Sequence, residues 1–520
     1  MKNRDIKRIL SIGIITVMCA AVTACGQTAG TGTTLDTTVS ESNVKENEDN
    51  GIENQNENGT SDEGADGQAP DGQWPEGQAP DGQAPNGQAP DGQAPDGQAP
   101  GNPPDGQPGG GFGGGSSSAD IDYTAAVEVT SADNQKGKTY SSTTADESAL
   151  LISTSDAVTV TNPTVTKTGD SDGGDNCNFY GLNAAVLVKD GSTTTITGGT
   201  ITSDADGANG VFSYGGNGGQ NGASGDGTKV IISDTTITTT GDGSGGIMTT
   251  GGGITEASNL TVETSGRSSA AIRTDRGGGT VTVDGGTYTT NGLGSPAIYS
   301  TADITVSNAT LTSNLSEGVC IEGINSITLH DCDMSANNTD TNGNATFYDT
   351  IMIYQSMSGD ADSGTSTFTM NGGTLTSKNG HVFHVTNTNA VINLNGVKIT
   401  NKDSDNILLS VCADGWTGDT NKATLNASNQ ALEGTILVGS DSELTLNLTD
   451  GSSFKGTIDG NITNAKGDTV STEVGTVSVS IDKNSTWTLT ADTYITSFDG
   501  DLSSVYTNGY TLYVNGVAMN

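Results

Sequence analysis

The run Gly-Gly-Thr-Tyr-Thr at residues 285–289 returns, with small changes, as Asn-Ala-Thr-Leu-Thr at residues 308–312. The copies are regularly spaced, because Thr287 lies 23 residues before Thr310 and 26 residues after Thr261 of an earlier copy. One turn of a parallel β-helix has about this length. The recurrence therefore predicts a solenoid of stacked turns. Further copies lie at residues 198–202, 234–238 and 372–376.

A second recurring run lies between these copies, as at residues 210–213, 271–274 and 318–321. Val, Ile and Thr alternate there with polar residues, which is typical of half-buried strands. Only Pro163 and Pro296 occur in the last 400 residues, and proline is poorly tolerated inside a hydrogen-bonded sheet. We therefore expect an all-β domain in which each turn supplies three short strands and neighbouring turns pair in parallel.

This repeat texture resembles the right-handed parallel β-helix surface proteins of the pectate-lyase-like superfamily. More narrowly, it is similar to the adhesin-like or carbohydrate-binding β-helix lipoproteins of anaerobic Gram-positive bacteria. The resemblance covers about residues 121–520 and depends on repeats rather than on a diagnostic site motif. It implies a single-stranded right-handed parallel β-helix and says little about activity.

The composition excludes several other classes of protein. Asp and Glu number 61 against 20 Lys and Arg, which gives a formal charge of −41. So acidic a chain would repel the phosphates of nucleic acid. One apolar run exists, at residues 9–22, so the chain is not a polytopic membrane protein.

The N-terminus has the organisation of an export signal. Basic residues precede the apolar run, which ends in Val-Thr-Ala-Cys at residues 22–25. This sequence resembles the bacterial lipoprotein cleavage box, which implies removal of residues 1–24 and a lipid on Cys25. The protein would then be exported and anchored to the outer face of the cell membrane, where acyl chains supply the anchoring energy. A plain signal peptide with an incidental cysteine is the alternative.

Two segments without a core follow the signal. Residues 25–66 are acidic and almost free of aliphatic side chains, so we expect disorder. Residues 67–118 hold a Gly-Gln-Ala-Pro-Asp repeat and a Gly/Ser-rich linker, which predict an extended tether. The β-helix domain is expected at residues 119–520.

Alignment of the second run predicts which side chains leave the domain. An aliphatic column from Val186 through Ile298 to Val382 and Ile407 should point inward, and the next residue in each strand should point outward. Two outward columns then gather aromatic and charged residues in a chain with only 4% aromatics. The members of this candidate face are Phe212, Tyr214, Arg273, Asp275, Arg276, Tyr299, Glu322, Tyr354 and Phe383.

Aromatic rings stack on the C–H surfaces of sugars, while Arg and carboxylates bind hydroxyls or uronates. The candidate face therefore predicts binding of an extracellular polysaccharide or a host or cell-wall glycan. The alternative is that insertions at residues 214–228 and 336–367 fold over the face and bury its aromatic residues as a satellite core.

Paired carboxylates at turn-like positions predict calcium binding, because Ca²⁺ prefers hard oxygen ligands. No complete calcium-binding motif accompanies them, and turn-forming Asp beside Gly and Ser is the alternative. The pairs chosen are Asp204 with Asp206, Asp360 with Asp362, and Asp403 with Asp405.

Catalytic signatures of the superfamily are missing from the sequence. The Arg-x-Pro-x-x-Arg signature of pectate lyases is absent, and Arg273 and Arg276 are the only clustered bases. Residues 338–340 match the first polygalacturonase motif, but its other motifs are absent. His384 is expected to point inward, and no Ser-His-Asp arrangement can be nominated.

The remaining cysteines, Cys177, Cys320, Cys332 and Cys412, are expected to be unpaired thiols. The sequence thus favours a non-catalytic surface lipoprotein that binds polysaccharide or mediates adhesion and requires no cofactor. A calcium-dependent polysaccharide lyase or hydrolase, and a purely structural rod, are the alternatives.

Overall fold

The computed structural model describes residues 121–218 and 222–519, which belong to one compact unit of residues 101–520. The expected signal peptide, Cys25, the acidic segment and the tether lie outside the described residues. Within these residues the chain forms 46 strands, one α-helix, α1 (Asp175–Phe179), and one 3-10 helix, η1 (Leu502–Ser504). The prediction of an all-β domain is confirmed.

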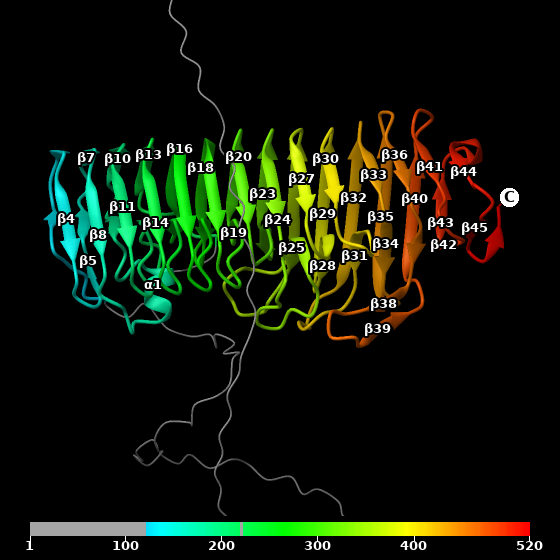
Figure 1. The fold of residues 1–520 in the computed structure, drawn as a ribbon, viewed down its shortest axis with the longest axis horizontal. Coiled ribbons are helices and arrows are strands. Elements are labelled where there is room, and N and C mark those ends of the chain that lie inside the picture. Colours follow the sequence, from blue (N-terminus) through cyan, green and yellow to red (C-terminus); the bar gives the residue numbers. More distant parts are fainter. Residues whose placement is uncertain (1–120, 219–221, 520) are drawn as a thin grey trace, which may run out of the picture. The chain divides into compact units, whose positions relative to one another are not determined.

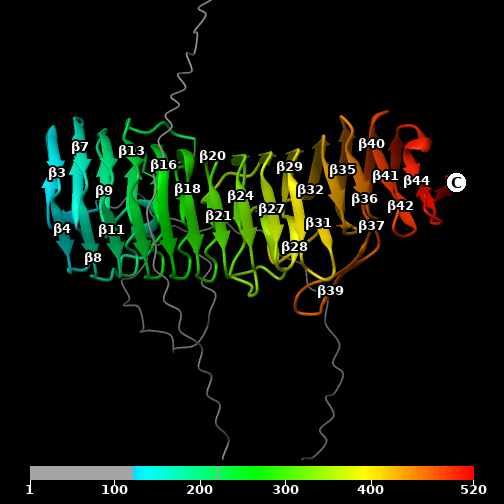
Figure 2. The ribbon, with the colours of Figure 1, turned by 45° about the horizontal axis from the view of Figure 1, so that its top comes forward.

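The strands stack side by side along the long axis of this unit (Figures 1 and 2). Among the described residues almost all strand pairs are parallel, and the antiparallel ones are β38–β39 and β45–β46. Strands pair with the equivalent strands of the next turn. In one such pair, Thr287 of one turn lies opposite Thr310 of the next. The architecture is one of long parallel sheets, compatible with a parallel β-helix-like solenoid.

One sheet has 13 strands and carries the candidate face. Its strands are β2 (Glu128–Val129), β6 (Leu150–Ser153), β9 (Val186–Lys189), β12 (Val211–Tyr214), β15 (Ile247–Thr250), β17 (Ile272–Thr274), β19 (Ile298–Ser300), β22 (Val319–Glu322), β25 (Asp349–Tyr354), β28 (His381–Thr386), β31 (Ile407–Val411), β34 (Thr435–Val438) and β37 (Ile458–Asp459).

A second sheet has 22 strands, and in most turns two successive strands belong to it. They are β3 (Asp133–Lys136), β4 (Thr139–Ser142), β7 (Ala157–Thr161), β8 (Thr164–Lys167), β10 (Thr193–Thr197), β11 (Thr200–Ser203), β13 (Lys229–Ser233), β14 (Thr236–Thr239), β16 (Gly253–Thr264), β18 (Gly279–Thr290), β20 (Asp303–Ser307), β21 (Thr310–Ser313), β23 (Ser326–His330), β24 (Asp333–Ala336), β26 (Thr365–Asn371), β27 (Thr374–Ser377), β29 (Thr388–Asn395), β30 (Lys398–Asn401), β32 (Asn421–Ser428), β35 (Ser442–Thr449), β40 (Thr476–Ile481) and β43 (Ser497–Asp499).

Four smaller sheets complete the described part of the chain. They contain β1 (Thr124–Ala125) and β5 (Glu147–Ser148); β33 (Ala431–Glu433), β36 (Ser453–Lys455), β41 (Thr486–Thr488) and β44 (Val505–Tyr506); β38 (Asn461–Thr463) and β39 (Thr469–Thr472); and β42 (Thr493–Ile495), β45 (Leu512–Val514) and β46 (Val517–Ala518).

A left-handed corner lies between two successive strands, or inside the long strands β16 and β18, in turn after turn. The corner residue always has a positive φ, and it is Asn, Asp or Gly, the residue types that tolerate this conformation. The recurring Gly or Asn that opens the sequence repeat is this corner. Its positions are Gly137, Asn162, Gly198, Asp234, Asn259, Gly285, Asn308, Asp331, Gly372, Gly396, Asn429 and Asp450.

The interior is one continuous hydrophobic cluster that extends from Val129 to Leu512. Strand residues alternate between buried and exposed, so that in β7 Val158 and Val160 are buried while Ala157 and Thr159 face outward. This period of two places every second side chain in the narrow core, where parallel strands from different sheets meet.

Candidate functional site

The register of the 13-stranded sheet defines its outward column. Neighbouring residues in this column pair strand by strand along the whole sheet. They are Glu128, Leu151, Leu187, Phe212, Met248, Arg273, Tyr299, Cys320, Met352, His384, Ser410, Leu437 and Asp459. From Leu187 to Met352 this is the column that the sequence predicted.

The predicted register is wrong beyond Met352. Ile351 pairs with Phe383 rather than with Val382, so Phe383 points inward and packs against Phe368 with ring centroids 5.8 Å apart. His384 consequently points outward, contrary to the expectation. In the next strand an irregularity between Ile407 and Leu409 brings Leu409 into the inward column. Each of these strands has two adjacent apolar residues, so the sequence pattern alone allows either one to point inward. The hydrogen-bond register with the neighbouring strand decides which of them does.

Insertions cover much of the outward column. Phe347 in the cover belongs to the range 336–367 that the alternative interpretation named, whereas α1, also in the cover, lies outside both ranges that it named. At one end Phe212 is completely buried in a satellite cluster with Leu151, Leu187 and Met248. The covering segment includes α1, and the Thr250 hydroxyl donates to the Phe179 carbonyl at 2.6 Å. At the other end Phe347 and other apolar residues form a second cluster. Figure 1 shows α1 and the β38–β39 hairpin on the same side of the stack.

The nine residues of the candidate face therefore differ in access to solvent. Four are buried, namely Phe212, Asp275, Glu322 and Phe383. Five are half-buried, namely Tyr214, Arg273, Arg276, Tyr299 and Tyr354. Most of the half-buried residues lie around the middle section of the column, between the two satellite clusters.

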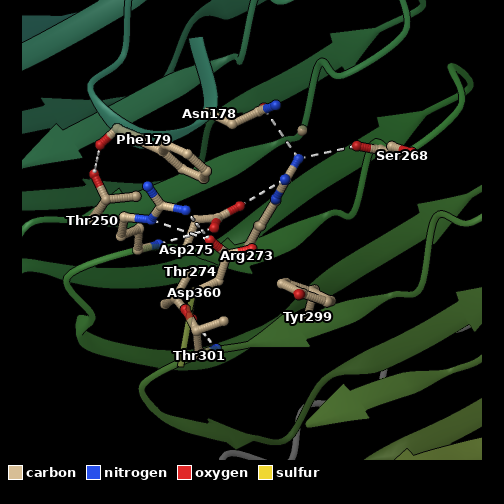
Figure 3. Close-up of polar contacts among 12 residues, drawn as sticks. Asn178, Phe179, Thr250, Ser268, Arg273, Thr274, Asp275, Tyr299, Thr301 and Asp360 are labelled. Carbon is tan, nitrogen blue, oxygen red and sulfur yellow. Dashed lines mark hydrogen bonds and ion pairs between the residues drawn. The ribbon is translucent and has the colours of Figure 1, made fainter. Parts of the chain in front are cut away.

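Arg273 is held from several directions in this middle section (Figure 3). Its Nη2 donates to Asp275 Oδ2 at 2.7 Å, and its Nη1 donates to Asn178 Oδ1 at 3.2 Å and to the Ser268 carbonyl at 3.0 Å. The guanidinium also lies 5.8 Å from the ring centroid of Tyr299. With 12% of its side chain exposed, Arg273 is ordered by its partners before any ligand arrives.

Arg276 joins two covering segments. Its Nη2 and Nε donate to Asp360 Oδ1 at 2.6 and 3.1 Å, and its guanidinium lies 4.2 Å from the centroid of the Phe179 ring in α1. Asp360 belongs to the segment between β25 and β26, so the ion pair connects this segment to the helix side of the face. The contact stabilises the cover rather than leaving a charge free for a ligand.

Glu322 is saturated by hydroxyl donors. Tyr299 and Tyr354 donate to its Oε2 at 2.5 and 3.2 Å, and the Ser356 hydroxyl donates to Oε1. The Tyr354 ring also packs against Trp416, with centroids 4.9 Å apart. Both tyrosine hydroxyls are thus directed to Glu322, and the two side chains are half-buried.

Burial changes the acidity of the carboxyl groups on this face. Desolvation raises the pKa of Asp275 to about 6, with Asp360 adding to the shift and Arg273 opposing it. Desolvation likewise raises the pKa of Glu322, against the hydrogen bonds that it accepts from Ser356 and Tyr299. The raised pKa of Asp275 is suited to proton transfer near neutral pH, but Asp275 and Glu322 are both enclosed by internal partners.

No protein-family model, curated protein or solved structure matches this chain. The likeness to the pectate-lyase-like superfamily therefore stays an inference from the repeats and the parallel sheets. Function has to be argued from the arrangement of the chain's own residues.

Of the six carboxylates predicted to bind calcium, Asp206 and Asp403 accept hydrogen bonds from backbone amides. Asp206 Oδ1 accepts from the Asp242 amide at 2.8 Å, and Asp403 Oδ1 accepts from the Asp405 amide at 2.9 Å. Asp360 is engaged by Arg276. Within residues 121–218 and 222–519, no group of three or more His, Cys, Asp and Glu side chains is placed to hold a metal ion. Calcium binding stays a prediction from sequence spacing.

The four cysteines of the described chain, Cys177, Cys320, Cys332 and Cys412, are free and buried, as expected. Burial raises the pKa of the Cys177 thiol to about 11, which keeps it protonated at neutral pH. In the same part of the chain, no helix has both the length and the apolar character needed to cross a membrane.

The sequence interpretation missed a buried chain of polar contacts under the second satellite cluster. The Ser410 hydroxyl lies 2.7 Å from Nδ1 of His381 and 2.8 Å from Nδ1 of His384. His384 Nε2 lies 3.3 Å from Asp414 Oδ2, and both of these side chains are completely buried. The correct register of β28 and β31 would have brought His384 and Ser410 together, because they pair directly.

The linked side chains of Ser410, His384 and Asp414 stabilise the covering segments, and a substrate cannot reach them. Asp414 Oδ1 accepts from the Thr346 amide at 2.9 Å and the Thr346 hydroxyl at 2.6 Å. The Phe347 ring lies over His384 with centroids 4.7 Å apart. Since Ser410 and His384 have no exposed surface, no acyl group can reach the hydroxyl while the cover is in place.

We expect His381 to make stability depend on acidity. Burial, aided by the neighbouring His384, lowers the pKa of His381 to about 3 against the attraction of Asp403 and Asp414. As pH falls from 7 to 4, His381 becomes protonated in the unfolded chain but stays neutral in the folded chain. This difference should lower the free energy of unfolding by up to about 3 kcal/mol. Denaturant unfolding at both pH values should show a smaller loss for His381→Asn than for the wild type. His330→Asn, in the other sheet, is the control, and equal losses for all three proteins would refute the assignment.

Proposed function

We propose that this chain is an exported, lipid-anchored surface rod whose right-handed parallel β-helix binds extracellular polysaccharide or mediates adhesion without cleaving its ligand. The observation that carries the non-catalytic part is the internal pairing of the charged groups on the candidate face. Arg273, Arg276 and Glu322 each have protein partners at hydrogen-bond distance. A catalytic carboxylate or base needs an open position beside the substrate.

The middle section of the face supports binding. The half-buried Tyr299 ring lies 5.8 Å from the Arg273 guanidinium, and its hydroxyl lies 3.4 Å from that of Tyr354. The Tyr354 ring in turn packs against half-buried Trp416. Ordered aromatic and Arg side chains lose little conformational freedom when a ligand arrives, which favours affinity. Ring edges and a fixed guanidinium suit the mixed apolar and hydroxylated surface of a sugar.

Binding by the full-length lipoprotein in detergent micelles, measured on a panel of neutral and acidic polysaccharides, tests the proposal. We expect Arg273→Ala, Tyr299→Ala and Tyr354→Ala together to lower the affinity at least about tenfold. Tyr288→Phe, which removes a hydroxyl inside the core, is the control. Unchanged binding by a folded triple variant would refute the face, and absence of binding by the wild type to the whole panel would refute the function.

A calcium-dependent lyase or hydrolase is the second candidate, favoured by the raised pKa of Asp275, at about 6. Release of unsaturated uronides, followed by absorbance with and without calcium, separates it from the first. Product formed by the wild type and abolished in Asp275→Asn would establish the enzyme instead of the binding protein.

A further inference from the structure

Exposed large apolar side chains gather at the C-terminal end of the stack. Of the eight found among the described residues, five lie between Tyr494 and Val517. The eight are Val127, Ile324, Met357, Tyr494, Leu502, Tyr506, Tyr510 and Val517. Three of the five are tyrosines, which are otherwise mostly buried or half-buried in this chain.

Two tyrosines form a ring pair on the outside of the last turns. Tyr494 in β42 pairs with Tyr513 in β45, and their rings are stacked with centroids 4.6 Å apart and planes 6° from parallel. Thr493 and Ile495, on either side of Tyr494, are buried, so the Tyr494 side chain points outward. It is 49% exposed although one ring face is used in the stack. The hydroxyl edges and the second face of Tyr494 are therefore open to a ligand.

Local charge selects the kind of ligand. From residue 484 to the last residue the sequence has no Lys or Arg, whereas Asp492, Asp499 and Asp501 lie there. An anionic glycan would be repelled by these carboxylates and by the overall charge of −41. A neutral sugar has no such penalty, and its C–H faces and hydroxyls match the apolar face and polar edge of a tyrosine ring.

The position of the pair suits contact with an external polymer. The first described turn and the C-terminal turn lie at opposite ends of the stack (Figure 1). The proposed lipid anchor is joined to the first of these ends through the chain that precedes residue 121. The tyrosine pair therefore lies at the end of the stack remote from that attachment point.

We propose that the Tyr494–Tyr513 pair, together with Tyr510 in the turn that leads into β45, is a binding site for a neutral polysaccharide. This inference rests on the proposed function and adds a second contact at the end of the stack. Two contacts on one polymer would raise the apparent affinity through effective concentration, without any further direct interaction.

The test uses the full-length lipoprotein in detergent micelles, with soluble β-glucan, mannan and xylan as neutral probes and polygalacturonate as the anionic probe. Tyr494→Ala with Tyr513→Ala should weaken binding to at least one neutral probe by tenfold or more. Tyr494→Phe with Tyr513→Phe keeps the ring stack and should lose less than threefold. Tyr506→Ala removes an equally exposed tyrosine from another sheet and should bind as the wild type does.

Several results would overturn this site. They are unchanged binding by the folded double-alanine variant, an equal loss in Tyr506→Ala, and stronger binding of polygalacturonate than of the neutral probes. Loss of a wild-type dimer on size-exclusion chromatography of the double-alanine variant would instead assign the pair to contact between two copies. If only the Arg273, Tyr299 and Tyr354 triple variant loses binding, the proposed function stands and this site fails; if the wild type binds no probe, the proposed function fails as well.

Discussion

Replacing Asp414 with alanine is expected to destabilise the covering segments of the 13-stranded sheet by about 3–5 kcal/mol. The Asp414 side chain is completely buried, accepts two hydrogen bonds from Thr346 and lies 3.3 Å from His384. Its removal leaves the Thr346 amide, the Thr346 hydroxyl and His384 Nε2 without this acceptor in a buried region. Denaturant unfolding followed by fluorescence would measure the loss.

A second readout shows whether the cover itself opens. Cys412 is buried in the cluster beneath the same segments, so its thiol should react faster with a thiol reagent in Asp414→Ala than in the wild type. Asp340→Ala is the matched control, because Asp340 is an exposed residue of a covering segment. Equal stability and equal Cys412 reactivity in the two variants would show that Asp414 does not hold the cover.

Replacing Gly266 with alanine is expected to cost more than about 3 kcal/mol, because the new methyl group meets backbone rather than side chain. A Cβ at Gly266 would lie 1.8 Å from the Gly241 carbonyl oxygen, and one at Gly292 would lie 1.8 Å from the Gly266 carbonyl oxygen. These glycines lie one above another in successive turns, so relief of the clash requires neighbouring turns to separate. The change in free energy of unfolding is measured by urea denaturation.

Gly343→Ala is the control for the general effect of adding a methyl group. Gly343 has a φ of +58° and no atom within 4 Å of the position of a Cβ. Only the strain of the left-handed conformation should appear there, at about 1 kcal/mol. Similar losses at Gly266 and Gly343 would refute close stacking of the turns at Gly241, Gly266 and Gly292.

The sequence was sufficient to predict the repeating strands because the same physical requirement recurs in each turn. An aliphatic residue must enter the narrow core and a left-handed corner must follow the strand, so the pattern around Thr261, Thr287 and Thr310 could be read directly. The prediction failed at Phe383, where Val382 and Phe383 are both apolar and periodicity offers two equivalent registers. Backbone pairing with Ile351 decides between them, and that information is not local.

Coverage of the candidate face was harder to predict for a different reason. Insertions lack the repeat, so their path depends on individual contacts such as the ion pair of Arg276 with Asp360, 84 residues further along the chain. The contact of His384 with Ser410 was missed because the register of β28 and β31 was predicted wrongly, and Asp414 was missed because it lies outside the repeated strands. The exposed pair at Tyr494 and Tyr513 was overlooked because the aligned column ended at Ile407.

The left-handed corners that recur from Gly137 to Asp450 have a consequence for how such a molecule changes over time. Each corner requires a residue that tolerates a positive φ. A segment the length of one repeat can therefore be duplicated or lost while the neighbouring turns keep the same conformation. The number of repeats, and with it the distance from the first described turn to the tyrosines at the other end, is therefore free to vary among descendants while the cross-section stays the same. Selection can set the reach of the protein by simple gene duplication, independently of whatever its surfaces bind.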